Sequence, residues 1–376
     1  MTRRGHGEGS IFRAKDGRWV AMLDLGYVLG RRKRKAFYGE TRRAVQERLA
    51  AALRDTQKGL PVVAERQTVA EHLESWLNAC KTTVRARTWL RYEQYVRIHA
   101  LPEIGRVPLA RLAPQHLQKL YARRIEAGSA PVTVAHLHAV LHRALSQAER
   151  WGLVPRNVAT LVDPPRIARR TVSTLSPDQT RALLEAAEAD RLGALYVLAV
   201  TTGMRQGELL ALRWQLLDLE GASLRVQATL QRVGGEMVFS EPKTAASRRR
   251  VMLTRRAVAA LRRHRVAQAE ERIRLGDVWQ DNDLVFPNEV GRPLEASNLL
   301  RRSFAPLLAR AGIARLRFHD LRHTAATLML GQGIHPKVVS EMLGHSQISV
   351  TLDLYSHVTS TMQRDATGAL DALLAK

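Results

Sequence analysis

The sequence predicts a multidomain protein that is mainly α-helical and contains small β-sheets. The chain has 376 residues, which is enough for two or three domains of about 150 residues each. Apolar residues recur at helical spacing over most of the chain, whereas short strand-like runs occur near the N-terminus and again after residue 218. We expect an N-terminal small β-sheet plus helix over 1–66, a helical domain over 67–165 and a mixed α+β domain over 166–376.

The composition favours a folded protein that binds a polyanion. Hydrophobic residues make up 45% and charged residues 25% of the chain, which is ordinary for a globular protein, but 59 Lys and Arg against 35 Asp and Glu give a net charge of +24. Nucleic acid is the first candidate partner and an anionic membrane surface the second. Cys80 is the only cysteine, which excludes an intramolecular disulfide framework and a cysteine-rich zinc module. No apolar run approaches the ~20 residues that span a bilayer, so we expect a cytoplasmic protein without membrane contact.

The first segment combines a strand pattern with a helix pattern. Apolar residues alternate over 18–25, and a helical pattern over 41–57 is stopped by Gly59 and Pro61. Between them lies the densest charge in the chain, formed by Arg31, Arg32, Lys33, Arg34 and Lys35. This run is either a solvated face or a hairpin that enters a DNA groove, where basic side chains contact phosphates.

The second segment reads as four helices, over 69–80, 87–100, 114–127 and 132–152. Gly128 and Gly152 are placed to end the last two. The basic residues Arg87 and Arg91 are expected on one side of this domain, where they are candidates for DNA contact. His138 and His142 are four residues apart, so they are either a metal pair or polar residues at the rim of the apolar stripe.

The third segment follows a proline-containing basic linker at 162–171. Ser176 and Pro177 predict a helix start, and helices are expected over 182–189 and 192–202. Strands are expected within 218–253, at 223–227, 237–241 and 248–253, and helices from Arg255 to the end.

Two local patterns in this segment carry candidate chemistry. In TGMRQGELLALRW (202–214), Arg205 stands at a helix start beside a glycine, where it is placed either to hold an anion or to pair with Glu208 on the surface. In HDLRH (319–323), two histidines four apart resemble the HExxH zinc pattern, so a zinc hydrolase is a rival hypothesis. It fits poorly, because Arg322 places a cation beside the metal, Asp replaces Glu and no third ligand is evident.

These patterns, in chain order, resemble the tyrosine recombinase family, the phage-integrase type of site-specific DNA recombinase. The family order is Arg, Lys on a β-turn, His-x-x-Arg, His or Trp, then Tyr. The matching residues are Arg205, Lys243, His319, Arg322, His345 and Tyr355. The surrounding LGHSQISVTLDLYSH (343–357) agrees as well. The match is close over about 172–360, less specific over the helical segment, and loose for an arm-type DNA-binding domain at 1–66.

The resemblance implies cleavage and rejoining of DNA through a 3′-phosphotyrosyl link on Tyr355, without metal, ATP or another cofactor. Arg205 and Arg322 would bind the phosphate, His319 would accept the phenol proton, Lys243 would protonate the leaving oxygen and His345 would hydrogen-bond the phosphate. Expected partners are double-stranded attachment sites and three further copies in a tetramer, with a directionality factor and a host DNA-bending protein as further candidates. Type IB topoisomerases share this chemistry, and an inactive DNA-binding regulator of the same fold is a further alternative.

Overall fold

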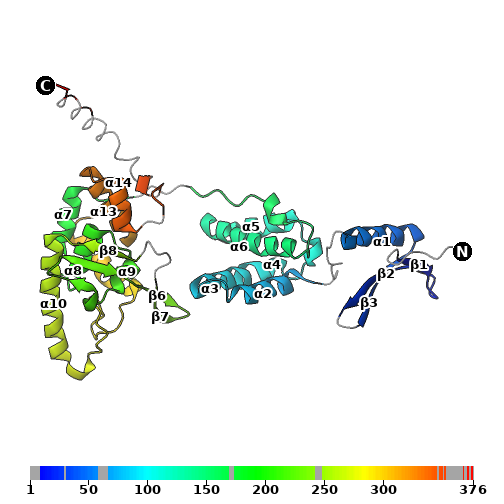
Figure 1. Ribbon diagram of the computed structural model, residues 1–376, viewed down its shortest axis with the longest axis horizontal. Coiled ribbons are helices and arrows are strands. Elements are labelled where there is room, and N and C mark those ends of the chain that lie inside the picture. Colours follow the sequence, from blue (N-terminus) through cyan, green and yellow to red (C-terminus); the bar gives the residue numbers. More distant parts are fainter. Residues whose placement is uncertain are drawn as a thin grey trace. The chain divides into compact units, whose positions relative to one another are not determined.

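Over the residues that it describes, the computed structural model is mainly helical and contains three small sheets, as expected (Figure 1). It describes residues 9–28, 31–57, 67–168, 173–241, 248–344, 347–349, 351–352, 367, 371 and 374–375. The chain divides into two compact units, Met1–Arg169 and Arg170–Lys376. Among the described residues, no helix has the length and apolar character needed to cross a membrane.

The N-terminal region is a three-stranded antiparallel sheet covered by one helix. Its elements follow one another along the chain: β1 (Ser10–Arg13), β2 (Trp19–Val28), β3 (Arg31–Gly39) and α1 (Arg42–Gln57). The strand order is β1-β2-β3, and the core is made by alternate β2 residues such as Ala21 and Leu23 with Val45 and Leu49 of the helix. The alternation over 18–25 and the helix over 41–57 were therefore predicted correctly.

A helical region with its own core follows. Its elements are α2 (Val69–Cys80), α3 (Ala86–Gln94), η1 (Tyr95–Ala100), α4 (Leu101–Ile104), η2 (Leu109–Arg111), α5 (Pro114–Glu126), α6 (Pro131–Arg150) and η3 (Val158–Leu161). A capping box on Thr68 starts α2, and Gly128 and Gly152 take positive φ after α5 and α6. The buried stripe of α6, which includes Val134, Leu137 and Leu141, packs against α2 and η1.

The helix expected over 87–100 is longer than the sequence suggested. It continues to Ile104, and the turn Tyr95–Ala100 is π-helical. Pro102 explains both features, because its missing N–H and its ring disturb the regular i to i−4 bonding of the preceding turn, and a wider turn accommodates it. The same arrangement recurs where η7 (Leu299–Phe304) precedes Pro306 in α12 (Ala305–Arg310).

The second unit mixes helices with a three-stranded sheet and a hairpin. Its helices are α7 (Pro177–Ala186), α8 (Gly193–Thr202), α9 (Gln206–Leu210), η4 (Trp214–Leu216), α10 (Arg255–Leu275), η6 (Gly276–Val278), α11 (Ala296–Asn298), η7, α12, α13 (Phe318–Gly331) and α14 (Pro336–Leu343). The strands are β4 (Leu217–Asp218), β5 (Ser223–Val226), β6 (Thr229–Val233), β7 (Glu236–Ser240) and β8 (Arg249–Met252); β4-β5-β8 form one sheet and β6-β7 the hairpin. Helix α8 is apolar all round because α7, α9, α10 and α13 contact it.

Two expectations for this unit were wrong in detail. The helix expected over 182–189 starts at Pro177, capped by Ser176 as predicted, and ends at Ala186. The helical stretch expected from Arg255 onward is interrupted over 279–295, where Pro287 and Pro293 form an isolated bridge and Gly291 takes positive φ. Prolines and a left-handed glycine within seven residues do not allow a helix.

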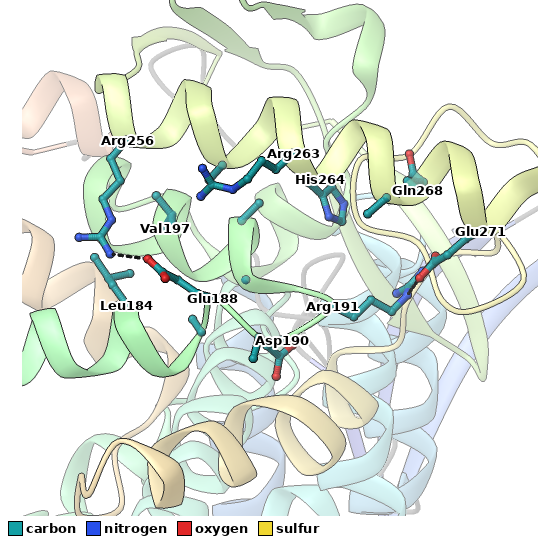
Figure 2. Close-up of a pocket in the computed structure, with 16 residues that line it drawn as sticks. Leu184, Glu188, Asp190, Arg191, Val197, Arg256, Arg263, His264, Gln268 and Glu271 are labelled. Atoms are coloured by element: carbon teal, nitrogen blue, oxygen red, sulfur yellow. Dashed lines mark hydrogen bonds and ion pairs between the residues drawn. The ribbon is translucent and has the colours of Figure 1, made fainter.

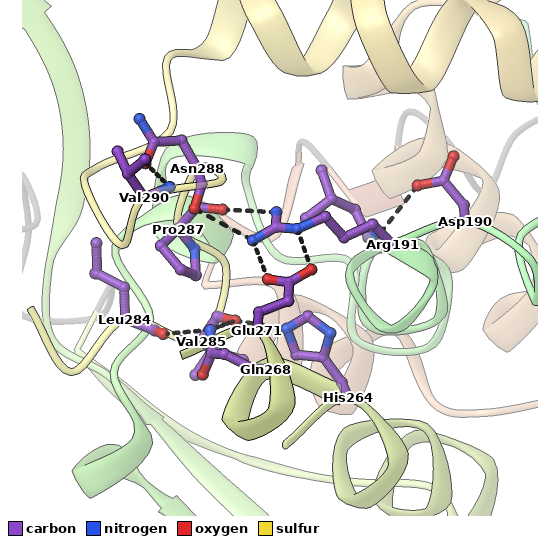
Figure 3. A network of polar contacts seen from close by, with 11 residues as sticks. Asp190, Arg191, His264, Gln268, Glu271, Leu284, Val285, Pro287, Asn288 and Val290 are labelled. Carbon is purple, nitrogen blue, oxygen red and sulfur yellow. Dashed lines mark hydrogen bonds and ion pairs between the residues drawn. The ribbon is translucent and has the colours of Figure 1, made fainter. Parts of the chain in front are cut away.

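A partly buried polar network connects this interruption to the core (Figure 3). Arg191, just before α8, donates to both carboxylate oxygens of Glu271 on α10 at 2.8 Å each, and also to the Pro287 carbonyl at 3.0 Å. His264 of α10 donates from Nε2 to the Val285 carbonyl at 2.6 Å, and burial lowers its pKa. The ring is therefore neutral at physiological pH, and the network fixes the loop without leaving an unpaired charge.

Candidate functional site

The turn between α8 and α9 forms the floor of the candidate site. Gly203 ends α8 with φ of +62°, and a Cβ at this position would clash with the Leu343 side chain of α14. Both the backbone conformation and the close approach of α14 therefore require glycine. The Gly203 carbonyl accepts a hydrogen bond of 2.8 Å from Nη1 of Arg322, so this turn connects α8, α13 and α14.

Arg205 begins α9 and is held by a carboxylate from the next turn. Its Nη1 donates to Oε1 of Glu208 at 2.7 Å, its backbone N donates to Oε2 at 3.0 Å, and its Nη2 donates to the Gly344 carbonyl at 3.1 Å. Glu208 is only 4% exposed. Burial opposes its ionisation, but Arg249 and Arg205 outweigh burial and hold the pKa of Glu208 below its usual range. Arg205 therefore pairs with Glu208, as one of the two interpretations of the sequence has it, but the carboxylate of this pair is buried instead of lying on the surface.

Arg322 of α13 is a buried cation with spare hydrogen-bonding capacity. Its side chain donates through Nη1 to Gly203, but Nη2 is buried and has no hydrogen-bond partner in the described part of the chain. Burial, reinforced by the charge of Arg205, lowers the pKa of Arg322 to about 9. An unpaired N–H on a desolvated guanidinium is costly, and a bound anion would satisfy it.

His319 lies one turn before Arg322 on the same helix. Its ring packs edge-on against the ring of His323 with 4.9 Å between centroids. Burial lowers the pKa of His319, with the charges of His323 and Arg322 acting in the same direction. The ring is therefore neutral at pH 7 and able to accept a proton.

Asp320, the carboxylate of HDLRH, accepts hydrogen bonds at the start of its own helix, from the N-cap residue Arg317. Arg317 donates to Asp320 through Nε at 3.0 Å and Nη2 at 2.7 Å, and its backbone N donates to the same side chain at 3.1 Å. Among the residues that the structure describes, no group of three or more His, Cys, Asp or Glu is arranged to hold a metal ion. His138, of the other histidine pair, contacts the Tyr121 hydroxyl through Nδ1 at 3.1 Å.

The structure brings together Arg205, His319 and Arg322, but the other three candidate residues lie outside the described residues. Lys243 falls in 242–247, His345 in 345–346 and Tyr355 in 353–366. Described residues border all three stretches: Glu241 and Arg248 flank the first, Gly344 and Gln347 flank the second, and Leu352 precedes the third.

Arg249, whose side chain is largely buried, is a residue of the site that could not be identified from the sequence. Its side chain is 7% exposed; Nη2 donates to Glu208 at 2.9 Å and Nε to the Met342 carbonyl at 2.6 Å. The signal was present in RRRVML, because Arg249 lies two residues before the buried Val251 and therefore on the same face of the strand. Arg250, on the other face, is exposed.

The candidate DNA-contacting residues lie on two separate elements. Arg31, Arg32, Lys33, Arg34 and Lys35 are all on β3, paired with β2 across a register shift between Asp24 and Tyr27. Arg34 is exposed, and the Lys35 ammonium lies 5.4 Å from the centroid of the Phe37 ring. Arg87 and Arg91 are exposed on α3, with the Arg91 guanidinium 5.7 Å from the Tyr95 ring centroid.

A recess elsewhere in the same unit is lined by residues of α8 and α10 and by the end of α7 with the turn that follows it (Figure 2). It contains ionic groups, but two of its arginines already have carboxylate partners: Arg191 pairs with Glu271 at 2.8 Å and Arg256 approaches Glu188 to 3.6 Å. It shares no residue with the cluster of Arg205, Arg249 and Arg322. We therefore assign it no part in the chemistry of that cluster.

This chain is similar to known integrases and tyrosine recombinases. Residues 173–362 match the phage integrase family, and residues 68–123 match the N-terminal SAM-like domain of phage integrases. A tyrosine recombinase XerC-like protein of Caldanaerobacter subterraneus subsp. tengcongensis is 31% identical over 365 residues, covering 92% of this chain and 93% of its own. An integrase of Streptomyces ambofaciens is 31% identical and covers 94% of this chain and 93% of its own.

Solved structures share the fold. The Tn1549 transposon integrase in complex with transposon right end DNA has a TM-score of 0.69 at 22% identity, covering 82% of this chain and 100% of that chain. A lambda integrase tetramer bound to a Holliday junction has a TM-score of 0.57 at 18% identity, covering 94% of this chain and 96% of that chain.

Proposed function

Because the chain belongs to the phage integrase family of tyrosine recombinases, we propose that it integrates or excises the DNA of a phage or an integrative mobile element. It cleaves and rejoins DNA at attachment sites through a 3′-phosphotyrosyl intermediate on Tyr355. The observation that carries the proposal is the buried N–H of Arg322, which has no partner in the described chain and lies in the same cluster as Arg205. A phosphodiester would provide the missing acceptor and the missing negative charge.

The proposed phosphate site is built from the two arginines. Arg205 keeps one guanidinium edge on Glu208 and Gly344, and is 39% exposed, so part of it remains accessible. Arg322 contributes Nη2 from the buried side. Charge that develops on the non-bridging oxygens during attack is stabilised by these fixed donors, and a planar guanidinium offers two N–H groups where lysine offers one point charge.

The proton transfers follow from the remaining residues. The phenol oxygen of Tyr355 attacks phosphorus, and its proton passes to neutral His319, whose lowered pKa leaves the ring unprotonated at pH 7. The bond from phosphorus to the 5′ oxygen breaks, and Lys243 donates a proton to that oxygen. His345 hydrogen-bonds the phosphate. The products are a 3′-phosphotyrosine and a free 5′-hydroxyl.

Rejoining is the reverse reaction with a different strand. The phosphotyrosine keeps a phosphate ester bond of similar free energy, so the 5′-hydroxyl of a partner strand can attack it and release Tyr355. The sequence of steps needs neither a metal ion nor ATP, because the two guanidinium groups supply the charge.

The other regions of the chain bind DNA in this proposal. Residues 1–66 form an arm-binding domain through Arg31–Lys35 on β3, residues 67–165 a core-binding domain through Arg87 and Arg91, and 166–376 the catalytic domain. The partners are double-stranded attachment sites and three further copies in a tetramer, with a directionality factor and a host DNA-bending protein as accessory proteins. The site of action is the cytoplasm that contains the DNA.

The test is covalent trapping on a nicked suicide substrate. Wild-type protein should form an adduct that mass spectrometry maps to Tyr355, in the presence or absence of EDTA, whereas Tyr355→Phe should bind DNA and form none. An adduct on another residue, or adduct formation by Tyr355→Phe, would overturn the proposal. Exchange between two sites distinguishes a recombinase from a topoisomerase, which only relaxes supercoiled DNA.

A further inference from the structure

Arg249 is a buried arginine that no step of the proposed reaction uses. It lies on β8 with its side chain on the same face as Val251, and only 7% of that side chain is exposed. A buried guanidinium without a functional or structural task would be costly, so its contacts indicate what it does.

The first contact fixes the carboxylate that holds Arg205. Nη2 of Arg249 donates to Oε2 of Glu208 at 2.9 Å, while Nη1 of Arg205 donates to Oε1 at 2.7 Å. The carboxylate therefore lies between two guanidinium groups, one buried and one partly exposed. Without Arg249, the partner that Oε2 keeps among the described residues would be the backbone N of Arg205 at 3.0 Å, and the Glu208 side chain would lose its fixed orientation.

The second contact fixes the end of α14. Nε of Arg249 donates to the Met342 carbonyl at 2.6 Å, and Nη2 of Arg205 donates to the Gly344 carbonyl at 3.1 Å. Gly344 has φ of +68°, and a Cβ there would lie 2.9 Å from Nη1 of Arg249. The two arginines therefore hold the backbone immediately before His345.

We infer that Arg249 is a positioning residue that holds Glu208 and the end of α14, so that Arg205 and the backbone leading to His345 keep one fixed arrangement. It touches neither DNA nor the reacting atoms in this role. The inference rests on the proposed function, because it concerns how Arg205 is presented to the scissile phosphate. Arg249 is also the first residue of β8, six positions after Lys243 in the sequence. Its side chain therefore connects the segments that carry or adjoin Lys243, Arg205 and His345.

The experiment is a double-mutant cycle on the full-length protein, read by single-turnover cleavage of a nicked suicide substrate at saturating DNA. Arg249→Gln should lower the cleavage rate constant about 10- to 100-fold, because displacing a catalytic group by about 1 Å has effects of this size. Arg249→Lys should recover part of the loss, since it keeps the charge but cannot bond both acceptors in the same geometry. Noncovalent DNA affinity should change less than about threefold in both. In an Arg205→Lys background, Arg249→Gln should cost less than about twofold, because a residue that acts through Arg205 has little left to position.

Arg250→Gln is the matched control, because it removes the same charge from the exposed face of the same strand. Its cleavage rate at saturating DNA should equal that of the wild type. Independent, multiplicative losses for Arg249→Gln and Arg205→Lys would overturn the inference and leave the proposed function intact, whereas wild-type cleavage by Arg205→Lys would overturn the proposed function itself. If Arg249→Gln does not fold, Arg249→Lys takes its place in the cycle, and its smaller loss must again disappear in the Arg205→Lys background.

Discussion

Replacing Arg322 by methionine should remove cleavage and yet leave the folded protein at least as stable as the wild type. Burial, reinforced by the charge of Arg205, lowers the pKa of Arg322 to about 9, well below that of a free guanidinium. At about 1.4 kcal/mol for each tenfold change in proton affinity, this difference corresponds to about 5 kcal/mol of unfavourable charge burial. The cost is present in full at neutral pH and is relieved only as the pH rises through about 9, because the lowered pKa disfavours the charged form in the folded state.

Methionine would remove this cost and lose one interaction. The hydrogen bond from Nη1 to the Gly203 carbonyl contributes about 1.5–3 kcal/mol as a charged bond, and Nη2 has no partner in the described chain to lose. Methionine fills a similar length of the buried site. The free energy of unfolding should therefore rise by about 2 kcal/mol at pH 7.

The assay measures the free energy of unfolding in the absence of DNA. Hydrogen exchange is followed by mass spectrometry at increasing denaturant concentration, on peptides from 173–241 and 318–344, so that the reported value is that of the unit containing Arg322. Arg249→Met is the contrast, since the side chain of that arginine is also largely buried but donates to both Glu208 and the Met342 carbonyl. It should lose about 3 kcal/mol, because one partner of a buried ion pair is left behind. A loss of more than about 1 kcal/mol for Arg322→Met would refute the claim that Arg322 is held at a cost for the sake of an anion.

Three further predictions concern the turn at Gly203, the proposed base His319 and the basic run Arg31–Lys35. Gly203→Ala should cost about 2–5 kcal/mol of unfolding free energy, the sum of about 1–2 for a left-handed residue and about 1–3 for overpacking against Leu343; a loss below 1 would contradict the required glycine. Burial lowers the pKa of His319, so the rate of cleavage should fall only as the pH drops below the usual range of a histidine, and His319→Gln should lack this acid limb; the same acid limb in His319→Gln and in the wild type would exclude His319 as the base. Reversing the charges at Arg31–Lys35 should flatten the salt dependence of DNA affinity by about one in the log–log slope for each lost phosphate contact, and an unchanged slope would return the run to a solvated face.

The sequence predicted helix starts well where a capping side chain lies next to the first turn. Thr68 and Ser176 cap α2 and α7 through their own side chains, so both starts are visible in the sequence. The alternation that placed β2 likewise depends only on which residues face α1. The sequence did not reveal the extension of the helix from 100 to 104, which contains Pro102, because the π-helical turn that accommodates this proline has no local sequence signature.

The sequence predicted those residues of the candidate site that belong to motifs in a recognisable order along the chain, but not the residues that contact them. Arg205, His319 and Arg322 were found from motifs, but their partners are separated along the chain: Glu208 meets Arg249 across 41 residues and Arg205 meets Gly344 across 139. No periodicity encodes such contacts. Only the strand alternation that puts Arg249 on the face of Val251 hinted that this arginine is buried.

The balance of charge in the cluster explains why burial of Arg322 is tolerated. Three guanidinium groups, from Arg205, Arg249 and Arg322, surround the single carboxylate of Glu208, which leaves a net charge of +2 from 3 − 1. Two of them are fixed by the carboxylate, while the third lies where solvent cannot reach it. The arrangement costs stability in the absence of DNA, but donors that are already in place and already dehydrated need no reorganisation when charge develops on a phosphate. Arg249 and Glu208 keep that arrangement rigid, and Arg205 and Arg322 use it.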